Sequence, residues 1–532
     1  MNCSWVGHWG HYVTMSDIQT PPDEQGISRS QMVWLMTGLS LGLFLSSTEQ
    51  SVVATALPTM AGELGQSDRI AWVVSAYLIT STISTPIYGK MSDLFGRRLI
   101  YLTAIAMFSI GSILCGLAPT MNTLVVSRAV QGLGGGGLLS MSFVIVGDVV
   151  SPRERGRYIG LFTSVFTVAA ISGPLWGGLL VDGPGWRWVF WTVVPLSAIT
   201  FGVSAFALRL PFATRRRPID WVGIALLIVA STALILVPIW GGQAYAWLSW
   251  PVLVAAIVGI VATILFVIQE GRAEEPVIPL HLFKDRTILA VFVMGAGIMG
   301  ALLALSTFMP LFLQISTGAS ATRSGLIMVP QTVAISLTAT ISGFLVTRTG
   351  HYKWTLVAGP IVAVAGMVGL TGIGVGTTAL SVGPVLFLLG CGLGLIFPNL
   401  TLSIQNTVDP QDLGIGTSTG NFFRSMGGAF GAAVGGSILA SRLGSELTSR
   451  LGAERLADVG GARGLIRTPS AIQDLPVDLR EAARESVAAS VTHLIWLIVP
   501  VLVVVLVAGL FVRERPLRTT SNVGGDRSAP SS

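Results

Sequence analysis

Three charged residues stand inside apolar stretches of the sequence that are long enough to cross a membrane. They are Glu49, Arg128 and Arg424, and the other lysines, arginines, aspartates and glutamates fall in loops or at the ends of such stretches. A charge in hydrocarbon is costly, so these residues usually face a bundle interior and mark proton, ion or substrate sites. We therefore take all three as candidate functional residues, with a purely structural polar contact as the alternative for each.

Glu49 is the candidate for proton-coupled chemistry, because a carboxyl group can bind and release a proton. With few opposing charges in reach, burial would disfavour its ionised form and make it a proton carrier. A cationic substrate could compete for the same carboxylate. Arg128 could tune that affinity if the two side chains face one cavity, and Arg424 is a candidate polar site in the second half of the chain.

The composition is that of a membrane protein. Of 532 residues 52% are hydrophobic and 11% are charged, whereas soluble domains carry about 25% charged residues. Stretches near the length of a membrane helix recur along the whole chain, and they predict an all-α integral membrane protein of about fourteen spans. We place these spans at roughly 32–58, 70–89, 99–118, 122–147, 158–181, 188–210, 221–240, 250–269, 287–313, 325–346, 354–376, 381–405, 414–440 and 491–512.

Basic residues concentrate in every second loop between these spans. Because cytoplasmic loops carry the excess of lysine and arginine, this phase places both termini in the cytoplasm of a multi-pass protein of the cell (inner) membrane. The net charge of +6 then reflects topology, and we expect the lipid bilayer rather than nucleic acid as the partner of this chain. The basic loop residues include Lys90, Arg97, Arg98, Arg153, Arg155, Arg157, Arg215, Arg216, Arg217, Arg272, Lys284, Arg348, Lys353, Arg513 and Arg515.

A weak internal repeat divides the chain. The segment "GKMSDLFGRR" at 89–98 is echoed by "GFLVTRTGHYK" at 343–353, and such echoes mark transporters built from two related helical bundles. We expect one chain to function as a monomer, and translation to begin at Met15 rather than Met1. The predicted parts are a cytoplasmic tail at 1–31, a six-helix bundle at 32–210, an inserted two-helix hairpin at 221–269, a six-helix bundle at 287–512 with an external loop at about 442–490, and a cytoplasmic tail at 513–532.

No cofactor or metal site is expected from the sequence. Cys3, Cys115 and Cys391 lack metal-ligand spacing. The glycine run at 132–137 lies in an apolar span and lacks the lysine and hydroxyl residue of a phosphate-binding loop, so it indicates close helix packing. Any active transport would therefore draw on an ion gradient rather than on ATP.

Four motifs in order resemble those of the major facilitator superfamily, in its fourteen-span drug:proton antiporter branch. They are "TEQSVVATALP" at 48–58, "GKMSDLFGRR" at 89–98, "RAVQGLG" from Arg128 and "GPLWGG" from Gly173. Glu49 stands where that branch usually has aspartate, and Ser51 where it usually has threonine. The resemblance covers nearly the whole chain.

The resemblance implies roles for particular residues. Glu49 and Arg128 would serve proton coupling and substrate binding, while Gln131 and Gly132 complete the fourth-span motif. Asp93 would control the conformational switch, with Arg97 and Arg98 as ion-pair partners, and Gly89 and Gly96 would permit a tight turn. Gly173, Pro174, Gly177 and Gly178 form the motif typical of antiporters, and the proline would kink that helix.

The leading interpretation is a secondary transporter, not an enzyme, that exports hydrophobic or cationic organic compounds in exchange for protons by alternating access. Its substrate would lie between two helical halves near the middle of the membrane. A dedicated exporter of one endogenous metabolite or lipid is the alternative within transporters. A membrane enzyme acting on lipids is a third reading, but it would need a cluster of acid, base or metal ligands that the sequence does not display.

Overall fold

The structure, a computed structural model, describes residues 28–65, 69–208, 218–241, 245–316, 318–319, 321–374, 377, 379–451 and 477–517. Every predicted span falls on a helix within these ranges. The predictions for the first 27 residues, for the loop at 209–217 and for most of the external loop lie outside the described residues. The helices are α1 (Arg29–Leu64), α2 (Ile70–Phe95), α3 (Arg97–Gly116), α4 (Met121–Val149), α5 (Pro152–Asp182), α6 (Trp188–Trp191), α7 (Val193–Ala207), α8 (Trp221–Trp240), α9 (Trp250–Glu270), α10 (Arg286–Ser316), α11 (Ala321–Thr349), α12 (Lys353–Leu370), α13 (Ala379–Thr407), α14 (Leu413–Leu451) and α17 (Val477–Phe511).

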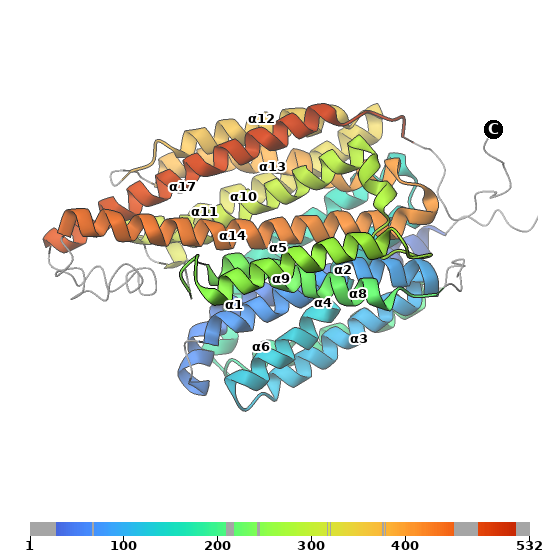
Figure 1. Cartoon of the computed structure of the whole chain (residues 1–532), viewed down its shortest axis with the longest axis horizontal. Coiled ribbons are helices and arrows are strands. Elements are labelled where there is room, and N and C mark those ends of the chain that lie inside the picture. The colour runs from blue at the N-terminus through green and yellow to red at the C-terminus, as the bar shows by residue number, and fades with distance from the viewer. Residues whose placement is uncertain are drawn as a thin grey trace, which may run out of the picture.

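The helices run roughly parallel or antiparallel to one another along one long axis (Figure 1). The turns at Gly96, Ser151 and Gly350 and the C-terminal residues 512–517 lie at one end, which we call the basic end because most of the basic loop residues gather there. The other is the far end. Two single-turn 3-10 helices, η2 (Leu280–Lys284) and η3 (Pro410–Asp412), also lie at the basic end, ahead of α10 and α14.

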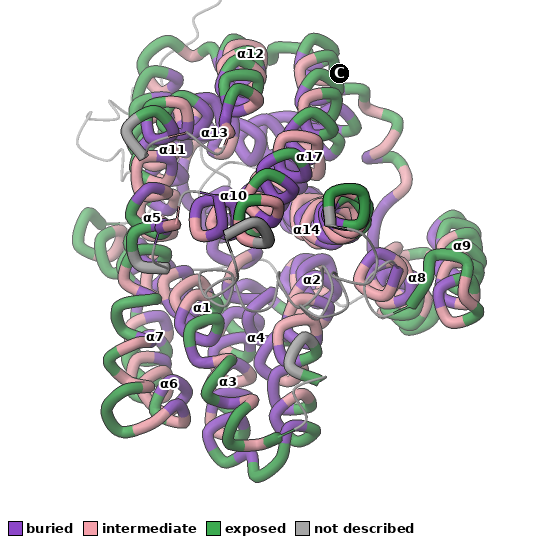
Figure 2. The backbone as a smooth tube through the Cα atoms, turned by 90° about the vertical axis from the view of Figure 1, so that its left-hand side faces the viewer, coloured by how far each residue is buried: buried purple, intermediate pink, exposed green. Residues whose placement is uncertain are grey.

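Two groups of helices pack against each other, with a hairpin at one side (Figure 2). Helices α1 to α7 contact one another in one group, and α10 to α14 with α17 in the other. The groups meet along two seams, α2 against α14 and α5 against α11. The hairpin α8–α9 lies beside the first seam, where α8 contacts both α2 and α14.

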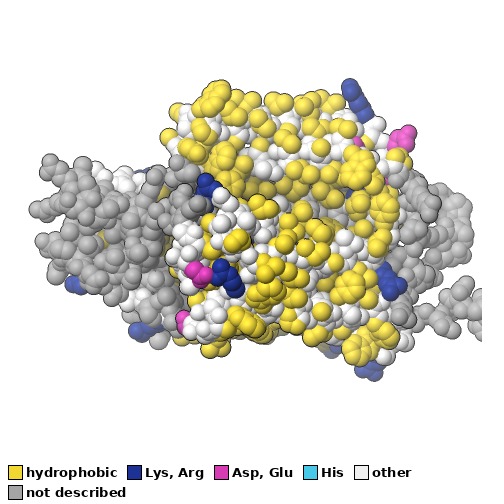
Figure 3. Space-filling model, turned by 90° about the horizontal axis from the view of Figure 1, so that it is seen from below, with side chains coloured by type: hydrophobic (Ala, Val, Ile, Leu, Met, Phe, Trp, Pro, Cys, Tyr) yellow, Lys and Arg dark blue, Asp and Glu magenta, His cyan; other side chains and the backbone are white. Residues whose placement is uncertain are grey.

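The outer surface between the two ends suits a lipid environment. Hydrophobic side chains cover most of the visible face, while charged ones stand mainly toward its ends (Figure 3). Within the described ranges, 11 helices are long and apolar enough to cross a membrane. Helices α1 and α14, which are not among these, carry Glu49 and Arg424.

The far end differs from the prediction at 442–490. Helix α14 continues to Leu451 and α17 begins at Val477, so both described ends of the predicted external loop, 442–451 and 477–490, are helical. Arg450 of α14 pairs with Glu485 of α17 and, at 3.5 Å, with Glu446 one turn earlier. Hydropathy located the membrane part of these helices and missed their polar extensions, which are held by ion pairs instead.

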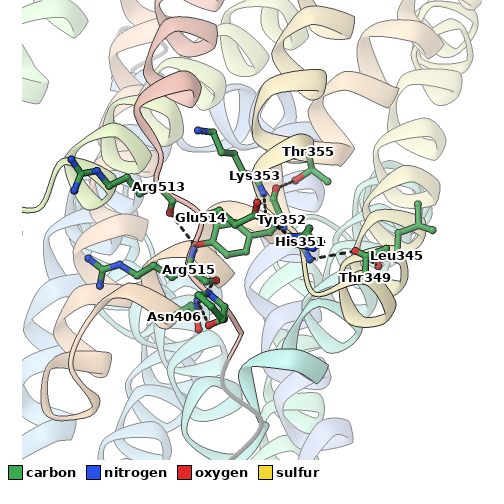
Figure 4. A network of polar contacts seen from close by, with 11 residues as sticks. Leu345, Thr349, His351, Tyr352, Lys353, Thr355, Asn406, Arg513, Glu514 and Arg515 are labelled. Carbon is green, nitrogen blue, oxygen red and sulfur yellow. Dashed lines mark hydrogen bonds and ion pairs between the residues drawn. The ribbon is translucent and has the colours of Figure 1, made fainter. Parts of the chain in front are cut away.

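Residues 512–517 fasten the basic ends of several second-group helices together (Figure 4). The Glu514 carboxylate accepts hydrogen bonds from the backbone N–H groups of Tyr352 and Lys353, at 3.0 and 3.4 Å, where α12 begins. Arg515 donates to Asp285 at 2.7 Å and to the carbonyl of Thr407 at 3.2 Å, ahead of α10 and at the end of α13. Unpaired N–H and C=O groups at helix ends need such partners.

We expect Glu514→Gln to destabilise the protein, because a neutral amide binds the start of α12 more weakly than a carboxylate does. The cost should be about 1 kcal/mol, as for the loss of other helix N-terminal caps. Thermal unfolding of the purified protein in one detergent measures it. Glu274→Gln, which changes an exposed glutamate in the loop after α9, is the matched control, and an equal shift in both variants would contradict the capping role.

Candidate functional site

Glu49 of α1 and Arg128 of α4 form a buried ion pair. An Nη1–H of Arg128 donates to Oε1 of Glu49, and each residue is 1% exposed. The prediction that Glu49 has few opposing charges in reach is therefore wrong. The sequence could not reveal the pairing because the two residues lie 79 positions apart and meet only when α1 and α4 pack.

Three other groups hold the guanidinium of Arg128 in place. Its Nη1 also donates to the side-chain oxygen of Gln131 at 2.6 Å, and its Nε donates to the carbonyl of Val73 at 3.1 Å. The ring of Tyr77 lies 4.4 Å from the guanidinium carbon, and Gln131 donates onward to Ser112 at 2.7 Å. The fourth-span motif thus positions an arginine that is bonded to α1, α2 and its own helix.

Glu49 is less completely satisfied than its partner. Its second oxygen, Oε2, is buried and has no hydrogen-bond partner, and the hydroxyl of Thr48 beside it is in the same state. A small pocket reaches this carboxyl group from between α1, α5, α6 and α7, with Trp176, Val189 and Leu196 among its mostly apolar walls. One oxygen of the carboxylate is therefore paired, while the other is left without a hydrogen-bond partner.

The glycines of the fourth- and fifth-span motifs bring helices close to α1 and α2. An added Cβ at Gly132 would lie 2.1 Å from Oγ1 of Thr80, and one at Gly177 would lie 2.1 Å from Oγ1 of Thr55. Gly173 meets α1 one turn further along, at Ser51, whereas a Cβ at Gly178 would meet nothing within 4 Å. Gly173 and Gly177 thus share the face that packs on the Glu49 helix, and Pro174 lies inside α5 beside them.

A second charged cluster joins the two groups at the basic end. The guanidinium of Arg97 contacts Asp93 at 2.5 Å and Asp148 of α4 at 2.6 Å. The other oxygen of Asp93 accepts the backbone N–H of Ile415 at 3.1 Å, in the first turn of α14. A carboxylate is favourable there because helix N-termini carry partial positive charge and free N–H groups. We call Asp93, Arg97, Asp148 and the start of α14 the α2–α14 latch.

Two residues of the same motif lie differently from the prediction. Gly96 does form the tight turn, with a φ of 91°. Gly89 lies inside α2, where an added Cβ would be 2.3 Å from Oγ of Ser418, so it allows α14 to approach rather than the chain to turn. Arg98 points away from Asp93 and donates to the carbonyl of Ala205 at 3.0 Å.

Arg155, at the start of α5, was predicted only as a topology-setting basic residue. It is 1% exposed and donates to the carbonyls of Gly147 and Val150 near the end of α4 and, at 3.3 Å, to that of Gln405 in the other group. The side chain of Gln405 in turn donates to the carbonyl of Phe143 in α4 at 2.9 Å. The close approach of Gly156 and Gly343 continues this contact along α5 and α11. No sequence signal distinguishes Arg155 from Arg153 or Arg157, because only packing shows which one is buried.

Arg424 of α14 is the third intramembrane charge, and it lies apart from the other two. Its Nη2 donates to Oγ1 of Thr401 at 3.2 Å, and its guanidinium carbon lies 6.0 Å from the ring of Phe397, both on α13. Its buried Nε has no hydrogen-bond partner. Across the described ranges, no set of three His, Cys, Asp or Glu side chains is arranged to hold a metal ion.

Comparison with known proteins agrees with this architecture. Residues 39–432 match the Major Facilitator Superfamily. The multidrug transporter protein MdtP of Bacillus subtilis (strain 168) is 36% identical over 407 residues, which cover 76% of this chain and 74% of the relative. Multidrug resistance protein 3 of the same organism is 34% identical over 398 residues, covering 75% and 78%.

A solved structure shares the fold. The crystal structure of the human organic anion transporter MFSD10 (TETRAN) aligns with a TM-score of 0.57 over 91% of this chain and 100% of that one, at 15% identity. That identity is low enough for the likeness to concern the fold alone. With the family match over most of its length, the chain belongs to the Major Facilitator Superfamily and is a membrane transporter rather than an enzyme.

Proposed function

We propose that this transporter exports hydrophobic or cationic organic compounds and takes up protons in exchange. The buried Glu49–Arg128 pair beside an apolar pocket is the observation that carries the proposal. Relatives named as multidrug transporters and efflux pumps support export of organic compounds. A dedicated exporter of one endogenous metabolite or lipid stays the alternative, since a promiscuous and a dedicated pocket can share this scaffold.

The coupling step is an exchange of partners at Glu49. A buried ion pair is held by mutual attraction, and removal of one charge leaves the other uncompensated. A proton on Oε2 of Glu49 would neutralise the carboxylate and weaken its bond to Arg128, whose hydrogen bonds to Gln131 and Val73 remain. Loss of the proton, or arrival of a cationic substrate, would return Glu49 to its ionised form. No cofactor enters this cycle, which draws on the proton gradient.

The access step concerns the basic end. There the α2–α14 latch, Arg155 and Gln405 close the space between the two helix groups. If this end faces the cytoplasm, the described conformation is closed toward the cytoplasm. Opening inward requires Asp93 to leave the start of α14 and Arg155 to leave Gln405, in an alternating-access cycle of rigid groups. We expect a single chain to perform it.

The proposed orientation is tested by accessibility in intact cells. Because basic loops stay in the cytoplasm, tags placed after Arg217 and after Lys353 should be protected from a membrane-impermeant reagent. A tag near Gly460 should react. Gly460 and Arg217 lie outside the described residues, so these sites test the topology independently of the helix packing. Labelling of the first two tags from outside would overturn a cytoplasmic location of the termini.

For the latch, we expect Asp93→Asn to reduce proton-driven efflux several-fold while the protein stays inserted and abundant. The amide loses the ion pair with Arg97 and binds the positively polarised start of α14 more weakly. Efflux of a fluorescent dye from cells at equal expression measures the effect. Asp182→Asn, at an exposed aspartate of the far end, should behave as wild type, and undiminished efflux by the Asp93 variant would refute the latch.

For the pair, we expect Glu49→Gln to abolish gradient-driven export and Glu49→Asp, the residue usual in the family, to retain it. The Gln variant also leaves Arg128 unpaired, which costs about 3 to 5 kcal/mol in a buried site and can lower expression.

The double variant Glu49→Gln with Arg128→Gln separates these effects. It removes both charges, so it should regain expression but still fail to couple efflux to an imposed pH gradient in vesicles. Proton-coupled efflux by a well-folded Gln variant would show that the proton travels elsewhere and that the pair is structural.

A further inference from the structure

Arg424 lacks the counter-charge that Arg128 and Arg97 have. Arg128 pairs with Glu49, and Arg97 pairs with Asp93 and Asp148. Among the residues that the structure describes, the only side-chain hydrogen-bond acceptor of Arg424 is the neutral hydroxyl of Thr401, and its Nε is buried without any acceptor. A charge within a membrane bundle without a partner costs several kcal/mol and marks a functional site by default.

Arg424 lies within the second helix group, near the layer that seals the basic end. Thr401 and Phe397 belong to α13, an inner helix that contacts α5, α10, α11, α12 and α14. One helical turn along α13 from Thr401 toward the basic end, Gln405 closes the contact with α4. Thr401, the hydrogen-bond partner of Arg424, therefore stands one helical turn beyond the layer that seals the basic end, and the side chain of Arg424 is half-buried.

The surroundings of the guanidinium favour an organic anion. The ring of Phe397 lies beside it, and Phe423, next along α14, stacks on Phe292 of α10 with ring centroids 5.1 Å apart. Gly295 of α10 faces Arg424, and a Cβ added to this glycine would lie 3.9 Å from Cβ of Arg424. Because glycine has no side chain, α10 leaves the space beside Cβ of Arg424 unfilled at this position. A planar guanidinium binds carboxylates through two parallel hydrogen bonds, and the free Nε–H is one of the two donors it would use.

We propose that Arg424 binds the negatively charged group of the transported compound, so that hydrophobic organic anions, carboxylates above all, are substrates. The Nε–H and an Nη–H of Arg424 face the carboxylate, Thr401 adds a hydroxyl, and the neighbouring aromatic rings contact the apolar body. This inference rests on the proposed function for the transport of the bound compound, but binding can be measured without transport. It widens the substrate class beyond neutral and cationic compounds.

The first test compares two ligands on the unchanged protein. Pyrenebutyrate and its uncharged methyl ester share one fluorescent apolar body and differ in the carboxylate. With purified wild-type protein in lipid nanodiscs at fixed pH, the carboxylate should bind at least about tenfold more tightly than the ester, as expected for a desolvated charge pair. Equal affinities would overturn the proposal. So would displacement of pyrenebutyrate by chloride at concentrations comparable to its own, which would indicate an inorganic anion site.

The second test changes the arginine. Arg424→Gln should weaken binding of pyrenebutyrate by about tenfold or more and leave binding of the ester unchanged, whereas Arg424→Lys should retain part of the preference. Arg442→Gln, an exposed position on the same helix, is the matched control. Should Arg424→Gln misfold, Thr401→Val must still reduce the preference for the acid. A folded Arg424→Gln protein that keeps the full preference contradicts the assignment.

A parallel measurement separates this inference from the proposed function. Proton-driven efflux of a cationic dye from wild-type vesicles reports on coupling, whereas the ratio of acid to ester affinity reports on Arg424. Proton-driven efflux without any preference for the acid would contradict the anion site at Arg424 and leave the proposed proton antiport intact. A preference for the acid without proton-driven efflux would support the anion site at Arg424 and contradict the proposed proton coupling.

Discussion

A charged side chain between membrane helices must find an opposite charge or a ring of backbone dipoles, and this requirement organises the polar interior of the protein. Arg128 has Glu49, and Arg97 has Asp93 and Asp148. Arg155 uses carbonyl groups at helix ends instead. Each of these ion pairs or hydrogen-bond sets joins different helices, so the arginine charge is neutralised only when those helices pack together. Arg424 is the exception, and its missing partner is what directs attention to a ligand.

The two seams between the helix groups are closed by opposite chemistry. At α2 and α14, a carboxylate, Asp93, meets the N-terminus of a helix; on the side of α5, a guanidinium, Arg155, meets carbonyls near the ends of α4 and α13. Both choices follow the helix dipole. In the internal repeat, Thr347 stands where the first half has Asp93, and its backbone carbonyl accepts from Arg153 at 3.4 Å. Bonds to backbone groups can break and re-form as rigid halves move.

The sequence predicted the helices better than it predicted their contacts. Hydropathy and length place each span because lipid imposes them locally on every segment. The interior depends on which faces meet, and there single residues diverged. Glu49 was expected to have few opposing charges in reach, Gly89 to form a turn and Arg98 to join the latch, yet α4, α14 and α7 supplied their actual neighbours. Arg155 could not be singled out at all, since three similar arginines stand within five positions.

The inserted hairpin bears on how the two helix groups can move. At the basic end Lys90 of α2 pairs with Glu275, just after α9, at 2.6 Å, and at the far end Trp247 donates to Ser437 of α14 at 2.9 Å. The hairpin is thus bonded to both helix groups and lies beside the α2–α14 seam, where lipid would otherwise reach. As the groups rock, one bond must yield, and the neutral bond to Ser437 is weaker than the largely buried ion pair. The hairpin would then move with α2 rather than with α14.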